Sequence, residues 1–179
     1  MRLFVALDLP DALRERLRFL AAGLPGARWV PAENLHATLR FIGEVPIWRA
    51  EEIDAALARL RAPSFPLSLA GVGIIERGGR LASLHAGIER SPALEHLHAK
   101  IETALQRVGL PPERRRFLPH ITLARIDACS EERLVTWVQA NNLFRAPPIQ
   151  VGHFTLFSSL LGKQASAYTP EVEYELALP

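Results

Sequence analysis

The stretch FLPHITLAR occupies residues 117–125, and its His-x-Thr-Leu core also occurs at residues 36–39, within NLHATLRF. Both copies lie in apolar, strand-like surroundings, in a chain with only six histidines. Side chains alternate between the two faces of a strand, so His36 is expected to share a face with Thr38, and His120 with Thr122. The repeated motif predicts two equivalent strands, each presenting one imidazole and one hydroxyl.

The elements around the motifs recur in the same order, which indicates an internal duplication. Pro10 matches Pro92, and His36 matches His120, each about 80 residues further along. Two halves of like topology usually pack about a pseudo-two-fold axis, which would bring the motif strands close together. Periodicity and Gly/Pro breaks predict strands over residues 2–8, 28–42, 65–75, 81–88, 116–126, 149–158 and 167–178, with helices after Pro10 and over residues 47–61, 91–108 and 130–141.

Two imidazoles facing one phosphate meet the needs of phosphodiester hydrolysis. Attacking water must lose a proton and the leaving oxygen must gain one. A histidine pKa near 6.5 lets one ring act as base and the other as acid at neutral pH. The threonine hydroxyls can hold the non-bridging oxygens. A single His-x-Thr is most often a satisfied core histidine, but a second copy in an equivalent position favours catalysis.

Composition narrows the alternatives. The 179 residues, 49% of them hydrophobic, fit one domain or two small lobes sharing a core. No stretch suits a membrane span or a secretory signal, so a cytoplasmic location is the default expectation. Cys129 is the only cysteine, which excludes an intrachain disulfide and a zinc cluster of thiolates. No histidine or carboxylate cluster accompanies either motif, so we expect no metal and no cofactor.

Arginine dominates the basic residues. The formal net charge is only +2, yet 19 of the 21 basic residues are Arg. The planar guanidinium fork suits phosphate recognition, although genomic composition or heat adaptation is the commoner cause of such a bias. The run of residues 114–116 directly precedes the second motif. It fits a solvated face or a phosphate-steering patch.

The segments RLFVALDLP, NLHATLRFIGEV and PHITLAR resemble the 2H phosphoesterase superfamily, named for its two His-x-Thr motifs. Within it they are most similar to the bacterial and archaeal RNA 2′,3′-cyclic phosphodiesterases, once described as 2′-5′ RNA ligases. The resemblance spans nearly the whole chain. It implies an α+β fold of two pseudo-symmetric lobes, each an antiparallel sheet with helices, around a central cleft. The single bilobal domain would cover residues 1–179, with halves of approximately 1–80 and 81–179.

The resemblance also implies an activity: metal-independent hydrolysis of RNA 2′,3′-cyclic phosphate ends to 2′-phosphomonoesters, with 2′-5′ RNA ligation as the reverse chemistry. RNA is the expected partner, no membrane is involved, and we expect a monomer. The implied roles are His36 as proton donor, His120 as proton acceptor, and Thr38, Thr122 and Arg125 as phosphate-binding residues. The residues alone leave the acid and base assignment open.

Several placements stay open at this point. Simple alternation puts Arg125 on the face opposite His120, so a phosphate role requires a bulge or a strand end. Arg40 is in phase with His36 and is a candidate to line the cleft. His85 is expected in the core or at the cleft rim. The aromatic residues Phe4, Trp29, Phe41 and Trp48 are core residues by default, although one of them can stack on a base.

Three other functions remain as alternatives. The same chemistry suits small cyclic nucleotides or an ADP-ribose cyclic phosphate. The second alternative is a non-catalytic RNA-binding module, against which the two titratable histidines argue because pure binding does not need them. The third is a metal enzyme, which would need a cluster of ligands that the sequence near the motifs lacks.

Overall fold

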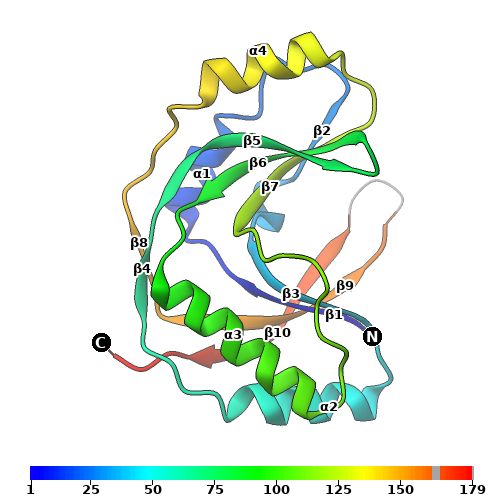
Figure 1. Cartoon of the computed structure of the whole chain (residues 1–179), viewed down its shortest axis with the longest axis vertical. Helices are drawn as coiled ribbons and strands as arrows, with labels where there is room; N and C mark the ends of the chain where they lie inside the picture. Colours follow the sequence, from blue (N-terminus) through cyan, green and yellow to red (C-terminus); the bar gives the residue numbers. More distant parts are fainter. Residues whose placement is uncertain (163–165, 179) are drawn as a thin grey trace.

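The computed structural model describes residues 1–162 and 166–178 (Figure 1). Its centre is an antiparallel sheet with the strand order β10-β9-β1-β3-β7-β6-β5, and β2 also pairs with β7. Within the described residues, β3 and β7 pair at a single position, Ala37 with Ile121. The sheet therefore consists of two half-sheets that meet at the two motif strands.

Each half-sheet has four strands. Half-sheet A contains β1 (Arg2–Leu7), β3 (Ala37–Glu44), β9 (His153–Leu160) and β10 (Ala167–Glu175). Half-sheet B contains β2 (Ala27–Trp29), β5 (Leu69–Arg77), β6 (Arg80–Ile88) and β7 (His120–Ile126). A separate two-stranded ribbon pairs β4 (Phe65–Leu67) with β8 (Ile149–Val151). The half-sheets thus do not follow a division of the sequence near residue 80, because each takes strands from both sides of it.

Four helices accompany the sheet: α1 (Asp11–Arg18), α2 (Ile47–Ala58), α3 (Pro92–Arg107) and α4 (Glu131–Asn141). The Ser91 hydroxyl caps α3 by accepting from the Leu94 amide at 3.2 Å, and Ser130 caps α4 in the same way. Leucine and isoleucine side chains at helical spacing bury one face of α3. Helices α2 and α3 pack together below half-sheet A, whereas α4 lies against β5 at the opposite end (Figure 1).

The first motif strand is shorter than the sequence predicts. Residues 28–42 were expected to be one strand, but they form β2, a 3-10 turn η1 (Ala32–Asn34) and then β3. Pro31 precedes the turn and lacks the backbone N–H that a continuous strand would need. His36 consequently lies one residue before β3, where the chain leaves the turn. No helix among residues 1–162 and 166–178 has the length and apolarity to cross a bilayer.

The apolar core lies on one face of the sheet. Alternate β1 residues Leu3, Val5 and Leu7 belong to the main cluster, which the helices cover. Phe4 and Ala6 point to the other face, where they pack with Phe157 and Tyr168 in a second, smaller cluster. The motif histidines lie on this second face.

Candidate active site

The two motifs meet where the half-sheets join. Ala37 and Ile121, the paired residues, are both buried in the core. Their neighbours on either side therefore project to the opposite face of the sheet. Extending the antiparallel register by one residue sets Thr38 across from His120, and His36 across from Thr122. The four motif side chains thus face one shared site.

A backbone carbonyl orients the ring of His36. Nδ1 lies 2.7 Å from the Asn34 carbonyl oxygen, which can only accept, so Nδ1 carries a proton and donates it. Nε2 then lies 3.0 Å from the Thr38 hydroxyl. Asn34 ends the 3-10 turn, and its side-chain amide donates to the Ser166 carbonyl at 2.8 Å. This turn fixes the tautomer and leaves Nε2 as the reactive nitrogen.

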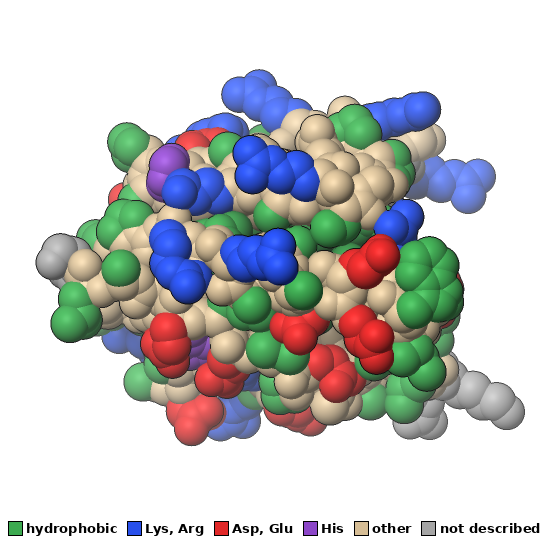
Figure 2. Space-filling view, turned by 90° about the horizontal axis from the view of Figure 1, so that it is seen from below, with side chains coloured by type: hydrophobic (Ala, Val, Ile, Leu, Met, Phe, Trp, Pro, Cys, Tyr) green, Lys and Arg blue, Asp and Glu red, His purple; other side chains and the backbone are tan. Residues whose placement is uncertain are grey.

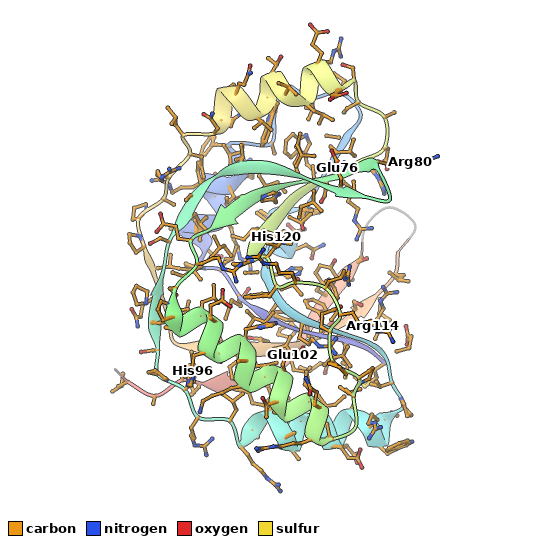
Figure 3. All side chains as sticks on the ribbon, in the orientation of Figure 1. Glu76, Arg80, His96, Glu102, Arg114 and His120 are labelled. Carbon is orange, nitrogen blue, oxygen red and sulfur yellow. The ribbon has the colours of Figure 1, made fainter. Side chains whose placement is uncertain are left out.

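His120 is held by the same device. Its Nδ1 donates to the Leu118 carbonyl at 2.6 Å, again two residues earlier in the chain. Nε2 is again the nitrogen left for chemistry. Figure 3 shows His120 near the middle of the molecule, where the loop from α3 enters β7. The two motifs therefore match in hydrogen bonding as well as in sequence.

The surroundings of His36 are mostly apolar. The ring centroids of Phe4 and Tyr168 lie 4.9 and 5.2 Å from its own. Burial lowers the pKa of His36, although the hydrogen bond to the Asn34 carbonyl opposes this shift. The positive charge of Arg14 lowers the pKa of His36 further, and the negative charge of Asp8 raises it. In the free protein His36 is therefore neutral at neutral pH, with an unprotonated Nε2.

A third imidazole lies beside the second motif. The His85 ring on β6 is 5.4 Å from the His120 ring, centroid to centroid and nearly perpendicular. Burial, and then the charge of His120, lower the pKa of His85 to about 4. Gly73 on β5 makes room for it, because a Cβ there would lie 2.7 Å from His85 Cε1. The pairing of β5, β6 and β7 brings these residues together, and strand alternation alone did not indicate it.

A β-bulge directs Arg125. On β6, His85 pairs with Thr122 and its neighbour Leu84 pairs with Ala124, so Leu123 is the extra residue on β7. Leu123 and Ala124 both face the core, and alternation resumes one residue later. Arg125 therefore returns to the face of His120, and its side chain is exposed. The bulge removes the conflict between alternation and a phosphate role for Arg125.

Strand β3 has the equivalent bulge, with a different result. Thr38 pairs with Ala6 and Arg40 with Val5, which makes Leu39 the extra residue. Arg40 turns to the core side, is only 8% exposed and pairs with Glu102. The expectation that Arg40 lines the site is therefore wrong.

Phe41 takes the place in half-sheet A that Arg125 has in half-sheet B. Phe41 pairs with Phe4 in the β1–β3 ladder, so it lies on the face of the second cluster. Its side chain is 49% exposed, which contradicts its default assignment to the core. One wall of the site thus offers an aromatic face and the other a guanidinium group.

No group of three or more His, Cys, Asp or Glu side chains is placed to hold a metal ion in the part of the chain that the structure describes. The donors gathered at the site are two motif imidazoles, two hydroxyls and one guanidinium group. That set suits proton transfer to and from an anion.

The comparisons with known proteins place the chain in a family. Residues 8–163 match the sequence profile of the 2′-5′ RNA ligase superfamily. The chain belongs to this superfamily. The relative called RNA 2′,3′-cyclic phosphodiesterase in Thermotoga maritima is 31% identical over 98% of this chain and 94% of its own length. The relative of the same name in Escherichia coli is 31% identical over 94% of this chain and 93% of its own.

Solved structures of the superfamily share the fold. The crystal structure of Escherichia coli LigT complexed with 3′-AMP aligns with a TM-score of 0.79 and 31% identity. The alignment covers 98% of this chain and 97% of that one. The mixed α+β architecture with antiparallel strands and helices is therefore that of the superfamily, as the resemblance implied.

Proposed function

We propose that this chain hydrolyses the 2′,3′-cyclic phosphate at the end of an RNA to a 2′-phosphomonoester. One observation carries the proposal: two imidazoles from opposite half-sheets face one site, each with Nδ1 held by a backbone carbonyl and Nε2 left for proton transfer, in His36 beside the Thr38 hydroxyl. The names of the Thermotoga maritima and Escherichia coli relatives support the same activity.

The reaction uses the two rings on opposite sides of the phosphorus. His120 Nε2 accepts a proton from water as the water oxygen bonds to phosphorus. The bond from phosphorus to O3′ breaks, and His36 Nε2 donates a proton to the departing O3′. The products are a 2′-phosphomonoester and a free 3′-hydroxyl. Each such proton transfer typically contributes about 10²–10⁴ in rate. With an RNA 5′-hydroxyl in place of water as the nucleophile, the same groups in the same roles would form a 2′-5′ phosphodiester, and exchanged roles would cleave that bond again.

The substrate itself prepares His36 for this role. Burial disfavours the imidazolium form in the free protein. The negative charge of a bound cyclic phosphate opposes that effect, because an anion within about 4–6 Å stabilises a cationic ring. His36 thus takes up its proton as the phosphate binds. The acid is ready only in the complex.

The remaining residues hold the substrate. The hydroxyls of Thr38 and Thr122 flank the rings and donate to non-bridging phosphate oxygens. Arg125 offers a guanidinium fork that can bind two of these oxygens and stabilise their growing charge. The exposed ring of Phe41 provides a surface on which any base can stack. All these groups come from one chain, so the proposed site is complete without a second copy.

Product analysis tests the proposal. The protein is incubated with an RNA that ends in a 2′,3′-cyclic phosphate, and the product isomer is identified. We expect the 2′-phosphate, and we expect His36→Ala and His120→Ala each to lose orders of magnitude in turnover while remaining folded. Undiminished activity in either variant would end the proposed pairing.

The acid and base assignment needs a separate experiment. A substrate with sulfur in place of O3′ has a leaving group that needs no protonation. His36→Ala should recover much of its activity on this substrate, whereas His120→Ala should not. The opposite pattern would exchange the two roles.

A further inference from the structure

A basic groove lies between α2 and α3, away from the motif histidines. It encloses about 430 Å³. Small and apolar residues line much of it, and its four cationic residues are Arg59, Arg61, Lys100 and Arg107, with no carboxylate among the lining residues. Figure 2 shows the basic side chains gathered in two rows over this face, with acidic side chains mostly beside them. We refer to this feature as the α2–α3 groove.

Four of the five carboxylates of the two helices have partners away from the groove, and the fifth, Glu51, does not line it. Asp54 on α2 accepts from the Tyr174 hydroxyl at 2.8 Å. Glu52 pairs with Arg49, Glu95 with Arg90, and Glu102 with Arg40. Across residues 1–162 and 166–178, no ion pair neutralises a cation of the groove. Four like charges gathered over one hollow repel one another and attract an anionic ligand.

The groove is held together across its two walls. Lys100 Nζ on α3 donates to the Arg61 carbonyl just beyond α2, at 2.7 Å. Its ammonium group is thus placed at the groove by a neutral acceptor and keeps its charge for a ligand. Arg59 and Arg107 are exposed, and their guanidinium groups have no hydrogen-bond partner among the described residues. Both guanidinium groups are available to an incoming phosphate.

The loop that joins α3 to the second motif also carries arginines. Arg107 ends α3, and the loop that follows carries Arg114, Arg115 and Arg116 before it reaches His120. All three loop arginines are exposed. Figure 3 shows Arg114 on this loop, between α3 and β7. Three further cations therefore lie in the chain between the groove and the second motif, one of which, Arg115, pairs with Glu113 at 3.5 Å.

We propose that the α2–α3 groove binds the phosphodiester backbone of a single-stranded RNA whose cyclic end occupies the motif site. The groove lining contains no aromatic residue, so it offers no surface for base stacking and would hold the strand without regard to sequence. This inference rests on the proposed function, and it makes long RNA a better substrate than a mononucleotide.

The charge count sets the size of the effect. For single strands, the logarithm of the binding constant falls with the logarithm of salt concentration by about 0.7 for each phosphate contact. Four contacts would weaken binding about 50-fold between 50 and 200 mM salt. Removing two of the four cations should reduce the slope by about 1.4.

Kinetics on two substrates test the inference. One is a 20-nucleotide RNA with a 2′,3′-cyclic phosphate end, and the other is a nucleoside 2′,3′-cyclic phosphate with the same reacting group and no further phosphates. The double variant Arg59→Gln, Arg107→Gln should raise KM for the RNA at low salt about tenfold and flatten its salt dependence. Both constants for the nucleoside substrate should stay unchanged. Arg59→Lys, Arg107→Lys should behave like the wild type.

Arg133→Gln on α4 is the control for net charge, because Arg133 is exposed and distant in the chain from the groove. It should leave the salt slope for RNA unaltered. An unchanged RNA slope in the Arg59→Gln, Arg107→Gln variant would overturn the groove proposal, as would equal losses on both substrates. If the wild type hydrolyses neither substrate, the proposed function fails. In that case, fluorescence anisotropy with the same RNA tests the groove proposal. The proposal stands only if the Arg59→Gln, Arg107→Gln variant binds the RNA more weakly than the wild type and with a smaller salt slope.

Discussion

Replacing Arg40 by methionine is expected to destabilise the fold while sparing the chemistry. The Arg40 guanidinium pairs with Glu102 on α3 and lies 3.7 Å from Glu113, and it donates to the Phe41 and Pro111 carbonyl oxygens. Methionine keeps the apolar volume of the stem but none of the donors. The Glu102 carboxylate, only 14% exposed, would be left without its partner.

The magnitude follows from that orphaned carboxylate. Removing one member of a buried ion pair costs about 3–5 kcal/mol, because the other charge stays buried and unpaired. A domain is typically stable by about 5–15 kcal/mol, so the loss is a large fraction of the total. Urea unfolding followed by tryptophan fluorescence measures the free energy of unfolding directly.

The double variant Arg40→Met, Glu102→Gln is the matched control. It removes the buried charge and should recover part of the lost stability. At a temperature where the single variant Arg40→Met is still folded, the kcat of that variant should remain within a few-fold of the wild-type value. A large fall in kcat/KM with an unchanged free energy of unfolding would refute this reasoning and show that Arg40 acts at the active site.

Three further predictions concern the imidazoles. Because burial lowers the pKa of His36 in the free protein, kcat/KM should decline with rising pH from below pH 6.5. In the enzyme–substrate complex the bound phosphate keeps His36 protonated, so kcat should decline only at higher pH. A decline of kcat/KM and kcat over the same pH range would contradict substrate-assisted protonation. His36 and His85 have lowered pKa values in the folded protein, so the unfolded chain binds more protons than the folded protein below about pH 6.5. The free energy of unfolding should therefore fall as the pH is lowered from about 6.5 toward 4. In His85→Gln the decline in the free energy of unfolding at pH 5 should be smaller by roughly 1 kcal/mol, after allowance for solvent screening. The same decline in the variant and the wild type would contradict a contribution from His85. Gly73→Ala should displace the His85 ring and lower turnover several-fold. Gly152→Ala is the control and should leave turnover unchanged, because a Cβ there meets no atom within 4 Å; equal activities of the two variants would show that the position of the His85 ring does not affect turnover.

The sequence predicts the regular parts of this molecule well. Ser91 and Ser130 are caps with a clear local pattern, and the helices they begin lie close to the predicted positions. The sharing of a face by His36 and Thr38, and by His120 and Thr122, follows from strand alternation. These features depend on local chemistry, which the order of residues contains.

Features that depend on pairing between strands cannot be predicted from the local sequence. The extra residues Leu39 and Leu123 look like ordinary strand residues, because a bulge is defined only against the partner strand. Those two residues decide that Arg40 turns inward and Arg125 outward. The position of His85 likewise depends on the register of three strands and on the space above Gly73.

Because strands β3 and β7 pair only at Ala37 and Ile121 in the described residues, this position is a candidate hinge between the two half-sheets. Each imidazole is anchored within its own half, so a small rotation at this hinge would alter the gap between the rings and leave both tautomers intact. We predict that such a rotation would let the site accommodate ligands of different bulk while both motifs keep their internal hydrogen bonds. We expect a bulkier side chain at position 37 to widen the gap and disfavour the smallest ligands first.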